Sequence, residues 1–437
     1  MSLVDLRIDA RWLIPIAPAG VLEHHSLLVD GGRIAAVLPT AQAGEFGARE
    51  HIALPTHALL PGLVNAHTHG AMTLLRGIAD DIPLKAWLEE HIWPREARFV
   101  AADFVHDGSL LAAAEMLRGG VTCCNDMYFF PDAAARAYSA SGMRAMLALP
   151  VLDLPTPYAA DADGCLQAGL AARDLWKHDP RLSFSLAPHA PYTVCDASFR
   201  KIVVYARQLE LPIQTHLLEA YDERAQSVAR HGAGPLQRLH ALGATGPGFI
   251  AIHCVHLDEA EIELLATQAC HVVHCPTSNL KLANGVAPVV ALQARGIAVG
   301  LGSDGAASNN RLDIFGEARL ASLIAKNTTG DAAALPAATA LRMATLDGAA
   351  ALGLDRDIGS LEPGKQADVI AVDLGGVQHS PCYDAVSHLV HVSGRDQVSD
   401  VWVGGDRLVA SGRLTRLDAQ DLLSRARFWH EQLQRPR

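Results

Sequence analysis

The feature that most constrains the fold of this chain is a regular alternation of short apolar runs and amphipathic helical segments through its middle. A short apolar run bounded by turn residues is typical of a buried strand, and a strand followed by a helix is the unit of a parallel sheet. The apolar runs are residues 59–66, 120–124, 143–152, 182–188, 212–215, 249–252, 271–275 and 297–302. The helical segments include residues 101–117, 132–140, 164–176, 196–209, 258–269, 288–294 and 312–326.

Capping residues support these helices. Asp132, Asp196 and Asp258 stand where helix N-caps belong, and Gly296 stands where a C-cap belongs. Eight strands with intervening helices predict an α/β fold of the (β/α)8, TIM-like barrel class. In such a barrel the chemistry lies at the carboxyl ends of the strands.

Both ends of the chain contain shorter β patterns. Residues 21–39 read as a hairpin around Asp30-Gly31-Gly32, and residues 400–414 and 367–374 show similar strands. We expect strands from both termini to pair in one small, discontinuous β-sandwich domain, residues 1–58 and 365–437, with a C-terminal helix over 418–434. The catalytic barrel then spans residues 59–364.

The composition indicates which kinds of partner the protein can bind and in which cellular compartment we expect it. The formal net charge of −11 argues against a nucleic-acid partner, because phosphate binding needs a basic surface. No apolar run approaches the ~20 residues of a membrane span, and charged residues interrupt any signal-peptide core near the amino terminus. The eight cysteines form no Cys-x-x-Cys pair, so we expect them to be reduced and the chain to be cytoplasmic.

Polar groups of metal-binding type follow most of the predicted strands. His67 and His69 follow the first strand two positions apart, which places them on one face. Each such residue alone has an ordinary explanation as a loop or turn residue, but together they predict a metal site at the carboxyl rim. The others, after the fourth to eighth strands, are His189, His216, His253, His274 and Asp304.

Three stretches carry a family resemblance: residues 74–96, residues 274–282 (His-Cys-Pro-Thr-Ser-Asn-Leu-Lys-Leu) and residues 302–310 (Gly-Ser-Asp-Gly-Ala-Ala-Ser-Asn-Asn). With the histidine order, they resemble the metal-dependent amidohydrolase superfamily, and within it the 5-methylthioadenosine/S-adenosylhomocysteine deaminases and their chlorohydrolase relatives. The resemblance runs from about residue 30 to about residue 405.

This resemblance implies that His67, His69, His216 and Asp304 hold one divalent metal ion, most simply Zn²⁺, with Fe²⁺ as the other choice. Three neutral nitrogens and a carboxylate suit zinc and leave a position for water, whose pKa falls to about 7 so that hydroxide is available. Binuclear relatives use a carboxylated lysine after the fourth strand. Here that position reads Ala-Pro-His189-Ala, so we expect one metal.

The resemblance also implies catalytic roles. Glu219 matches the acid/base glutamate, which protonates ring nitrogen N1 of a purine and the leaving ammonia. His253 would hold the attacking water or the tetrahedral oxygen, and Asp304 would take the proton of the water. Trp87, Glu96 and His189 match nucleoside contacts, with Glu96 accepting from both ribose hydroxyls.

The expected reaction is hydrolytic deamination of a small-molecule nucleoside to its inosine analogue. Where the family binds the carboxylate of S-adenosylhomocysteine it uses arginine after the third strand, and residues 143–179 offer only Arg144, at the start of a strand, and Arg173, within a helix. We therefore expect 5′-methylthioadenosine or adenosine to be preferred.

Two alternatives stay open. One is an enzyme of the same subgroup acting on guanine, a pterin or a chlorinated triazine, for which Glu96 has no ribose to bind. The other is a non-catalytic paralogue, which predicts loss of at least one of the six metal and acid/base residues, yet all are present. The pattern leaves homo-oligomerisation open.

Overall fold

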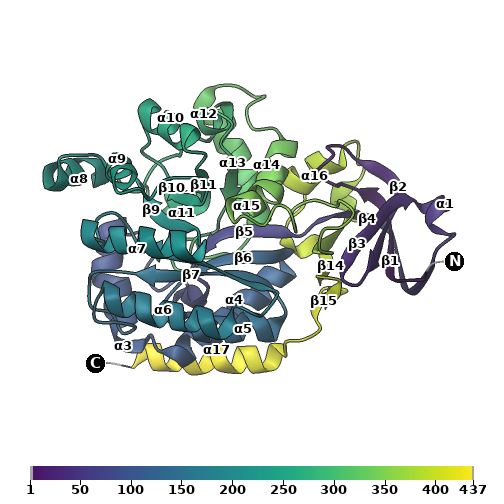
Figure 1. Cartoon of the computed structure of the whole chain (residues 1–437). Coiled ribbons are helices and arrows are strands. Elements are labelled where there is room, and N and C mark those ends of the chain that lie inside the picture. Colours follow the sequence, from purple (N-terminus) through teal and green to yellow (C-terminus); the bar gives the residue numbers. More distant parts are fainter. Residues whose placement is uncertain (1–2, 436–437) are drawn as a thin grey trace.

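The centre of the molecule is a parallel eight-stranded barrel, seen in a computed structural model that describes residues 3–435 (Figure 1). Its strands lie in chain order, and each pairs in parallel with the next. The expected (β/α)8 class is therefore confirmed. The strands are β5 (Leu63–Thr68), β6 (Val121–Met127), β7 (Arg144–Val151), β8 (Leu182–Pro188), β9 (Ile213–Leu217), β10 (Phe249–His253), β11 (His271–His274) and β12 (Val299–Leu301).

The barrel closes between its last and first strands through residues that follow β12. The Asp304 amide donates to the His67 carbonyl oxygen at 3.0 Å, and the Ser303 amide donates to Asn65 Oδ1 at 2.9 Å. This closure brings the two ends of the predicted metal-ligand set together, although more than 200 residues separate them in the chain.

The first barrel strand begins later than the sequence predicted. The predicted run started at Leu59, but Leu59 and Pro61 pair with β13 as part of β4, in the other sheet. Gly62 joins the two sheets without a loop. A side chain there would lie 2.0 Å from Thr122 Oγ1 of β6, so the close approach requires glycine. Apolar residues continue across this junction, which hid it from the pattern.

Strands from the two termini form a second, eight-stranded sheet, ordered β16-β15-β14-β13-β4-β1-β2-β3. Figure 1 shows its purple and yellow strands together at one end of the barrel. The expected hairpin is confirmed by antiparallel pairing of β2 with β3 around Gly31-Gly32. The domain limits at 58/59 and 364/365 stay a prediction. The strands are β1 (Leu3–Leu13), β2 (Leu22–Asp30), β3 (Arg33–Pro39), β4 (Gly47–Pro61), β13 (Val369–Asp373), β14 (Val398–Val403), β15 (Asp406–Ala410) and β16 (Arg413–Leu414).

Helices cover the barrel, and α17 runs along α4 (Figure 1). Asp258 caps α10 with a capping box, whereas Asp132 and Asp196 lie within the first turns of α5 and α7 rather than at their N-caps. Helices α8 and α9, after β9, were not predicted. The main helices are α4 (Ala102–Arg118), α5 (Pro131–Ser141), α6 (Ala162–Trp176), α7 (Asp196–Leu209), α8 (Glu223–His231), α9 (Pro235–Ala241), α10 (Glu259–Thr267), α12 (Val289–Ala294), α13 (Ile314–Thr329) and α17 (Ala419–Gln434).

Shorter helical elements fill the connections. The segment after β5 contains a π-helical turn, η2, which leads directly into α3. The short elements are α1 (Thr40–Ala43), η1 (Gly70–Leu75), α2 (Leu84–Ala86), η2 (Trp87–Ile92), α3 (Trp93–Phe99), α11 (Pro276–Lys281), α14 (Ala337–Met343), α15 (Leu346–Ala351), η3 (Val377–His379), α16 (Ala385–His391) and η4 (Arg395–Gln397).

A buried ion pair links the two sheets. Arg144, at the start of β7, donates to both carboxylate oxygens of Asp368, just before β13, at 2.9 and 3.0 Å. The position of Arg144 is the one predicted, at the amino end of its strand and away from the catalytic rim.

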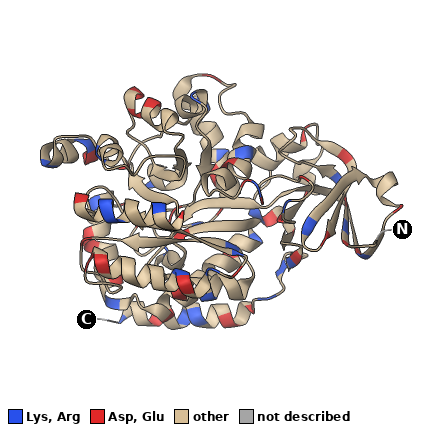
Figure 2. Cartoon of the chain, in the orientation of Figure 1, with Lys and Arg blue, Asp and Glu red and all other residues tan. Residues whose placement is uncertain are grey.

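Charges of both signs are mixed along the helices (Figure 2). Within residues 3–435, no helix combines the length and the apolar character needed to cross a membrane.

Candidate active site

The carboxyl ends of β5 and β12 place two histidines against one carboxylate. His69 Nε2 lies 3.1 Å from Asp304 Oδ1, and His67 Nε2 lies 3.5 Å from the same oxygen. The other oxygen, Oδ2, accepts from the hydroxyls of Ser278 and Ser308, each at 2.6 Å. The serines therefore orient the carboxylate so that Oδ1 faces the imidazoles.

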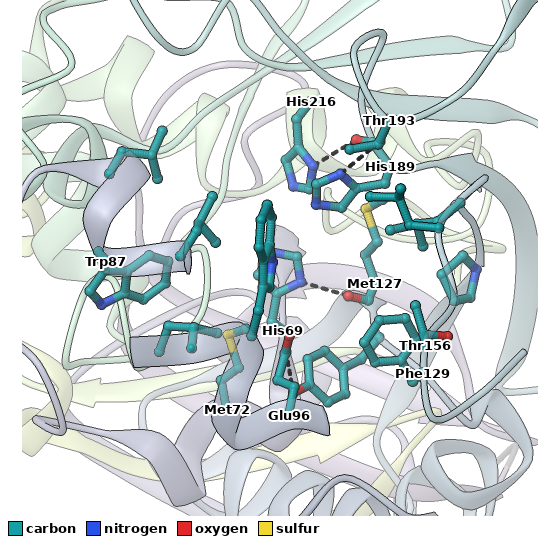
Figure 3. Close-up of a pocket in the computed structure, with 18 of the residues that line it drawn as sticks. His69, Met72, Trp87, Glu96, Met127, Phe129, Thr156, His189, Thr193 and His216 are labelled. Atoms are coloured by element: carbon teal, nitrogen blue, oxygen red, sulfur yellow. Dashed lines mark hydrogen bonds between the residues drawn. The ribbon is translucent and has the colours of Figure 1, made fainter. Parts of the chain in front are cut away.

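Backbone carbonyls set the tautomers of two histidines, as Figure 3 shows. His69 Nδ1 donates to the Met127 carbonyl at 2.6 Å, and His216 Nδ1 donates to the His189 carbonyl at 2.8 Å. A carbonyl only accepts, so Nδ1 carries a proton in each ring, and Nε2 is the nitrogen that faces the site. His216 Nε2 lies 3.3 Å from His67 Nε2.

These donors fit a divalent metal ion. Two groups, His67–His69–Asp304 and His67–His216–His253, have their ligand atoms within 4.8 Å of one another. Histidine ring nitrogens turned inward around a carboxylate are suited to bind a divalent cation. His253, to which the resemblance gave a catalytic role, is thus also within reach of an ion.

Electrostatics point the same way. Burial lowers the pKa of His67 to about 3 and holds the pKa of His216 well below its usual range, so both are neutral ligands at pH 7. Burial also acts on His69, but the Asp304 carboxylate outweighs it and raises the pKa of His69 to about 9. The hydrogen bonds from His67 and His69 lower the pKa of Asp304 despite its burial. A positive charge beside the Asp304 carboxylate is therefore favoured, and either a proton on His69 or a bound cation supplies it.

Glu219 and His253 form a second pair beside the histidine cluster. Glu219 follows β9, and its Oε2 lies 3.7 Å from His253 Nε2. Asn284 Nδ2 donates to Glu219 Oε1 at 2.9 Å, and His253 Nδ1 donates to Asn279 Oδ1 at 2.9 Å. Burial raises the pKa of Glu219, which favours the protonated carboxyl group that a general acid needs.

A cavity of about 280 Å³ connects these groups to the predicted substrate contacts. Trp87 from η2 and Glu96 from α3 lie on one side of it, and His189 and His216 lie on another (Figure 3). Glu96 is 7% exposed, so its carboxylate is buried although the stretch in which it lies, Pro-Arg-Glu-Ala-Arg, includes three charged residues. The ninth predicted site residue, His67, belongs to the histidine cluster. The other eight line this cavity: Trp87, Glu96, His189, Glu219, His69, His216, His253 and Asp304.

One rim histidine does not join the site. His274 lies between Val273 and Cys275, which both pack inside the barrel, so its side chain takes the opposite face. It lines a separate hollow between α12 and α13. The two arginines of residues 143–179 are also elsewhere: Arg144 pairs with Asp368, and Arg173 pairs with Asp174.

Several residues that support the site were not predicted. Ser278 and Asn279 belong to the 274–282 motif, so that stretch was the available signal for them. Glu223 accepts from the amides of Leu218, Glu219 and Ala220 at 2.8 to 2.9 Å and thereby holds the turn that carries the acid/base glutamate. No pattern in the sequence distinguishes Tyr128, which contacts Glu96.

A parallel eight-stranded barrel that gathers histidines and an aspartate at its carboxyl rim defines the class of metal-dependent hydrolases. The sequence model of the amidohydrolase family matches residues 58–408. The chain belongs to this family.

Individual relatives resemble the chain over nearly its whole length. A protein of Teredinibacter turnerae named 5-methylthioadenosine/S-adenosylhomocysteine deaminase is 46% identical and covers 98% of both chains. The structure of an adenosine deaminase from Xanthomonas campestris with bound zinc has a TM-score of 0.98, 47% identity and 99% coverage of both chains. An atrazine chlorohydrolase of Arthrobacter aurescens, complexed with zinc, has a TM-score of 0.90 at 25% identity, covering 97% of this chain and 99% of that one.

Proposed function

We propose that this protein deaminates an adenosine-type nucleoside, 5′-methylthioadenosine or adenosine, to the inosine analogue and ammonia. One observation carries the proposal: the buried carboxylate of Glu96 lines the same cavity as Glu219 and the histidine cluster. A buried carboxylate in a substrate cavity needs hydrogen-bond donors, and the two ribose hydroxyls supply them. Relatives above 40% identity are named 5-methylthioadenosine/S-adenosylhomocysteine deaminase or adenosine deaminase, which supports deamination of a nucleoside of this class.

The metal ligands we propose are His67, His69, His216 and Asp304, and the ion is zinc, as in the Xanthomonas structure. When bound, such an ion lowers the pKa of a water far below that of bulk water, to about 7. Residue 189 is a histidine, and no lysine follows β8 before α7, so we infer a single metal ion.

The chain's own residues then move protons. Glu219 gives a proton to ring nitrogen N1 as a water oxygen adds to C6. The water proton that Asp304 accepts then passes through Glu219 to the departing amine, and the proton of the new C6 hydroxyl restores the Glu219 carboxyl as the C6–amine bond breaks. Asp304, whose pKa is held low by His67 and His69, accepts the proton of the water. His253, oriented by Asn279, holds the oxygen that adds to C6. Trp87 and His189 hold the nucleoside in the cavity.

The cavity favours an uncharged 5′ group. Among the described residues that line it there is no lysine or arginine, whereas Leu88, Leu154 and Pro155 are present. An ionised amino-acid tail gains nothing from such a surface and loses hydration on entering it. We therefore infer that S-adenosylhomocysteine is a poor substrate.

The test follows the absorbance change from the adenine to the hypoxanthine chromophore during incubation with 5′-methylthioadenosine. We expect conversion, its loss after treatment with a chelator, and its return on adding Zn²⁺. An adenine chromophore that never converts refutes the proposal, and conversion of guanine or a triazine instead identifies the alternative enzyme. Cytoplasmic location and homo-oligomeric state stay predictions.

A further inference from the structure

Tyr128, the residue that follows β6, makes one polar contact that the reaction as described does not use. Its hydroxyl donates to Glu96 Oε1 at 2.7 Å, and both side chains are buried, at 5% and 7% exposure. Burial raises the pKa of Glu96, and the Tyr128 hydroxyl acts against that rise. The tyrosine thus favours the ionised carboxylate, which is the form that accepts hydrogen bonds on both oxygens.

The position of Tyr128 relative to the metal ligands gives this contact a further consequence. The preceding residue, Met127, accepts from His69 Nδ1 through its carbonyl at 2.6 Å. Figure 3 shows His69 joined to Met127, with Glu96 close to His69. Two consecutive residues at one strand end therefore hold a metal ligand and Glu96. This end of β6 sets the separation between the reacting centre and Glu96.

We propose that Tyr128 is a specificity-determining positioning residue: its hydroxyl holds Glu96 Oε1 so that Oε2 is turned to the cavity and accepts the 2′- and 3′-hydroxyls of the ribose. The inference rests on the proposed function and deepens it. A carboxylate held by one donor has a single orientation, whereas an unheld one rotates about its last side-chain bond. Tyr128 thereby couples recognition of the diol to placement of the base at the metal centre.

The same strand offers a matched control. Tyr138, on α5, donates its hydroxyl to Asp126 Oδ2 at 2.8 Å, and the tyrosine is fully buried. Both pairs thus join a buried tyrosine hydroxyl to a buried carboxylate near the end of β6. Neither Asp126 nor Tyr138 is among the described residues that line the cavity. Removing either hydroxyl has a comparable structural cost, but only the loss of the Tyr128 hydroxyl alters the cavity.

The experiment compares adenosine with 2′,3′-dideoxyadenosine, which lacks the diol. In the Tyr128→Phe enzyme we expect kcat/KM for adenosine to fall about tenfold to a hundredfold, mainly through KM, as for a lost hydrogen bond to a charged group. For dideoxyadenosine we expect less than about a threefold change, with zinc content as in the wild type. The Tyr138→Phe enzyme should change both substrates by the same factor.

One further variant keeps the inference falsifiable if Tyr128→Phe does not fold, and a double variant tests the coupling of the two residues if it does. Glu96→Asp shortens the side chain so that its carboxylate loses the tyrosine hydroxyl, and it should reduce the ratio of adenosine to dideoxyadenosine activity at least tenfold. The double variant Glu96→Gln/Tyr128→Phe should deaminate adenosine as fast as Glu96→Gln alone, because the Tyr128 hydroxyl acts only through the Glu96 carboxylate.

Equal losses for both substrates in Tyr128→Phe overturn the role of Tyr128 while leaving the deaminase intact. An unchanged ratio in Glu96→Asp overturns the ribose contact of Glu96 and with it this inference. A wild-type enzyme that deaminates neither nucleoside overturns the proposed function and this inference together.

Discussion

Replacing Glu219 with glutamine tests the acid/base assignment with little disturbance of the fold. Asn284 Nδ2 donates to Glu219 Oε1 at 2.9 Å. Glutamine has the same shape as glutamate, and its Oε1 can still accept this hydrogen bond. His253 Nδ1 carries the proton that it donates to Asn279, so His253 Nε2 presents a lone pair to the new amide group. We expect a change of less than about 1 kcal/mol in the free energy of unfolding.

The effect on rate should be large because an amide cannot transfer the proton. General acid–base catalysis contributes about 10²- to 10⁴-fold, which is about 2.7 to 5.4 kcal/mol of the activation barrier. Glu219 does not belong to either candidate metal group, so the zinc content of Glu219→Gln should equal that of the wild type. His67→Ala, in contrast, should lose both zinc and activity.

The assay combines elemental analysis for zinc with the absorbance change of 5′-methylthioadenosine under saturating conditions. Glu219→Gln enzyme that keeps its zinc and turns over within about tenfold of the wild type would refute the reasoning. Loss of zinc from this variant would equally contradict the separation of acid/base and metal-binding roles drawn from the geometry.

Three other predictions concern selectivity, the ion pair between the two sheets and the turn that carries Glu219. S-adenosylhomocysteine should have a kcat/KM at least about tenfold below that of 5′-methylthioadenosine, since burying an unpaired charge costs more than 1.4 kcal/mol; equal values would show that its tail finds a partner. Arg144→Met should lower the free energy of unfolding by about 3–5 kcal/mol in urea titrations, because Asp368 stays buried without its partner, and KM should not change. Adding Asp368→Leu should restore much of the lost stability. Glu223→Gln should lower kcat more than it changes KM, since the amide cannot accept from all three backbone amides of the 218–220 turn; wild-type kcat would exclude a positioning role.

Much of the barrel was predictable because its signals are local. Each buried parallel strand reads as a short apolar run, and β8 at Leu182–Pro188 and α7 at Asp196–Leu209 have the predicted bounds. The junction between the two sheets at Gly62 could not be predicted, because buried strands of two different sheets follow one another with no polar residue between them.

Strand ends also predicted which residue types gather at the rim. In a closed parallel barrel all carboxyl ends lie on one rim, so His67, His216 and Asp304 come together whatever lies between them. The face that a terminal residue takes is a separate matter. His274 follows the same pattern in the sequence, yet it turns outward because its neighbours Val273 and Cys275 fill the barrel interior.

The sequence by itself determined the order of the strands, the chemical types at their ends and hence a metal-dependent reaction. Only the tertiary structure decided which side chains share a cavity. The resemblance implied a ribose contact at Glu96, but only the structure shows its carboxylate buried against Tyr128, a residue that no sequence pattern distinguished. The physical reason is that periodicity encodes burial along one element, whereas a contact between Glu96 and Tyr128 depends on how two elements pack.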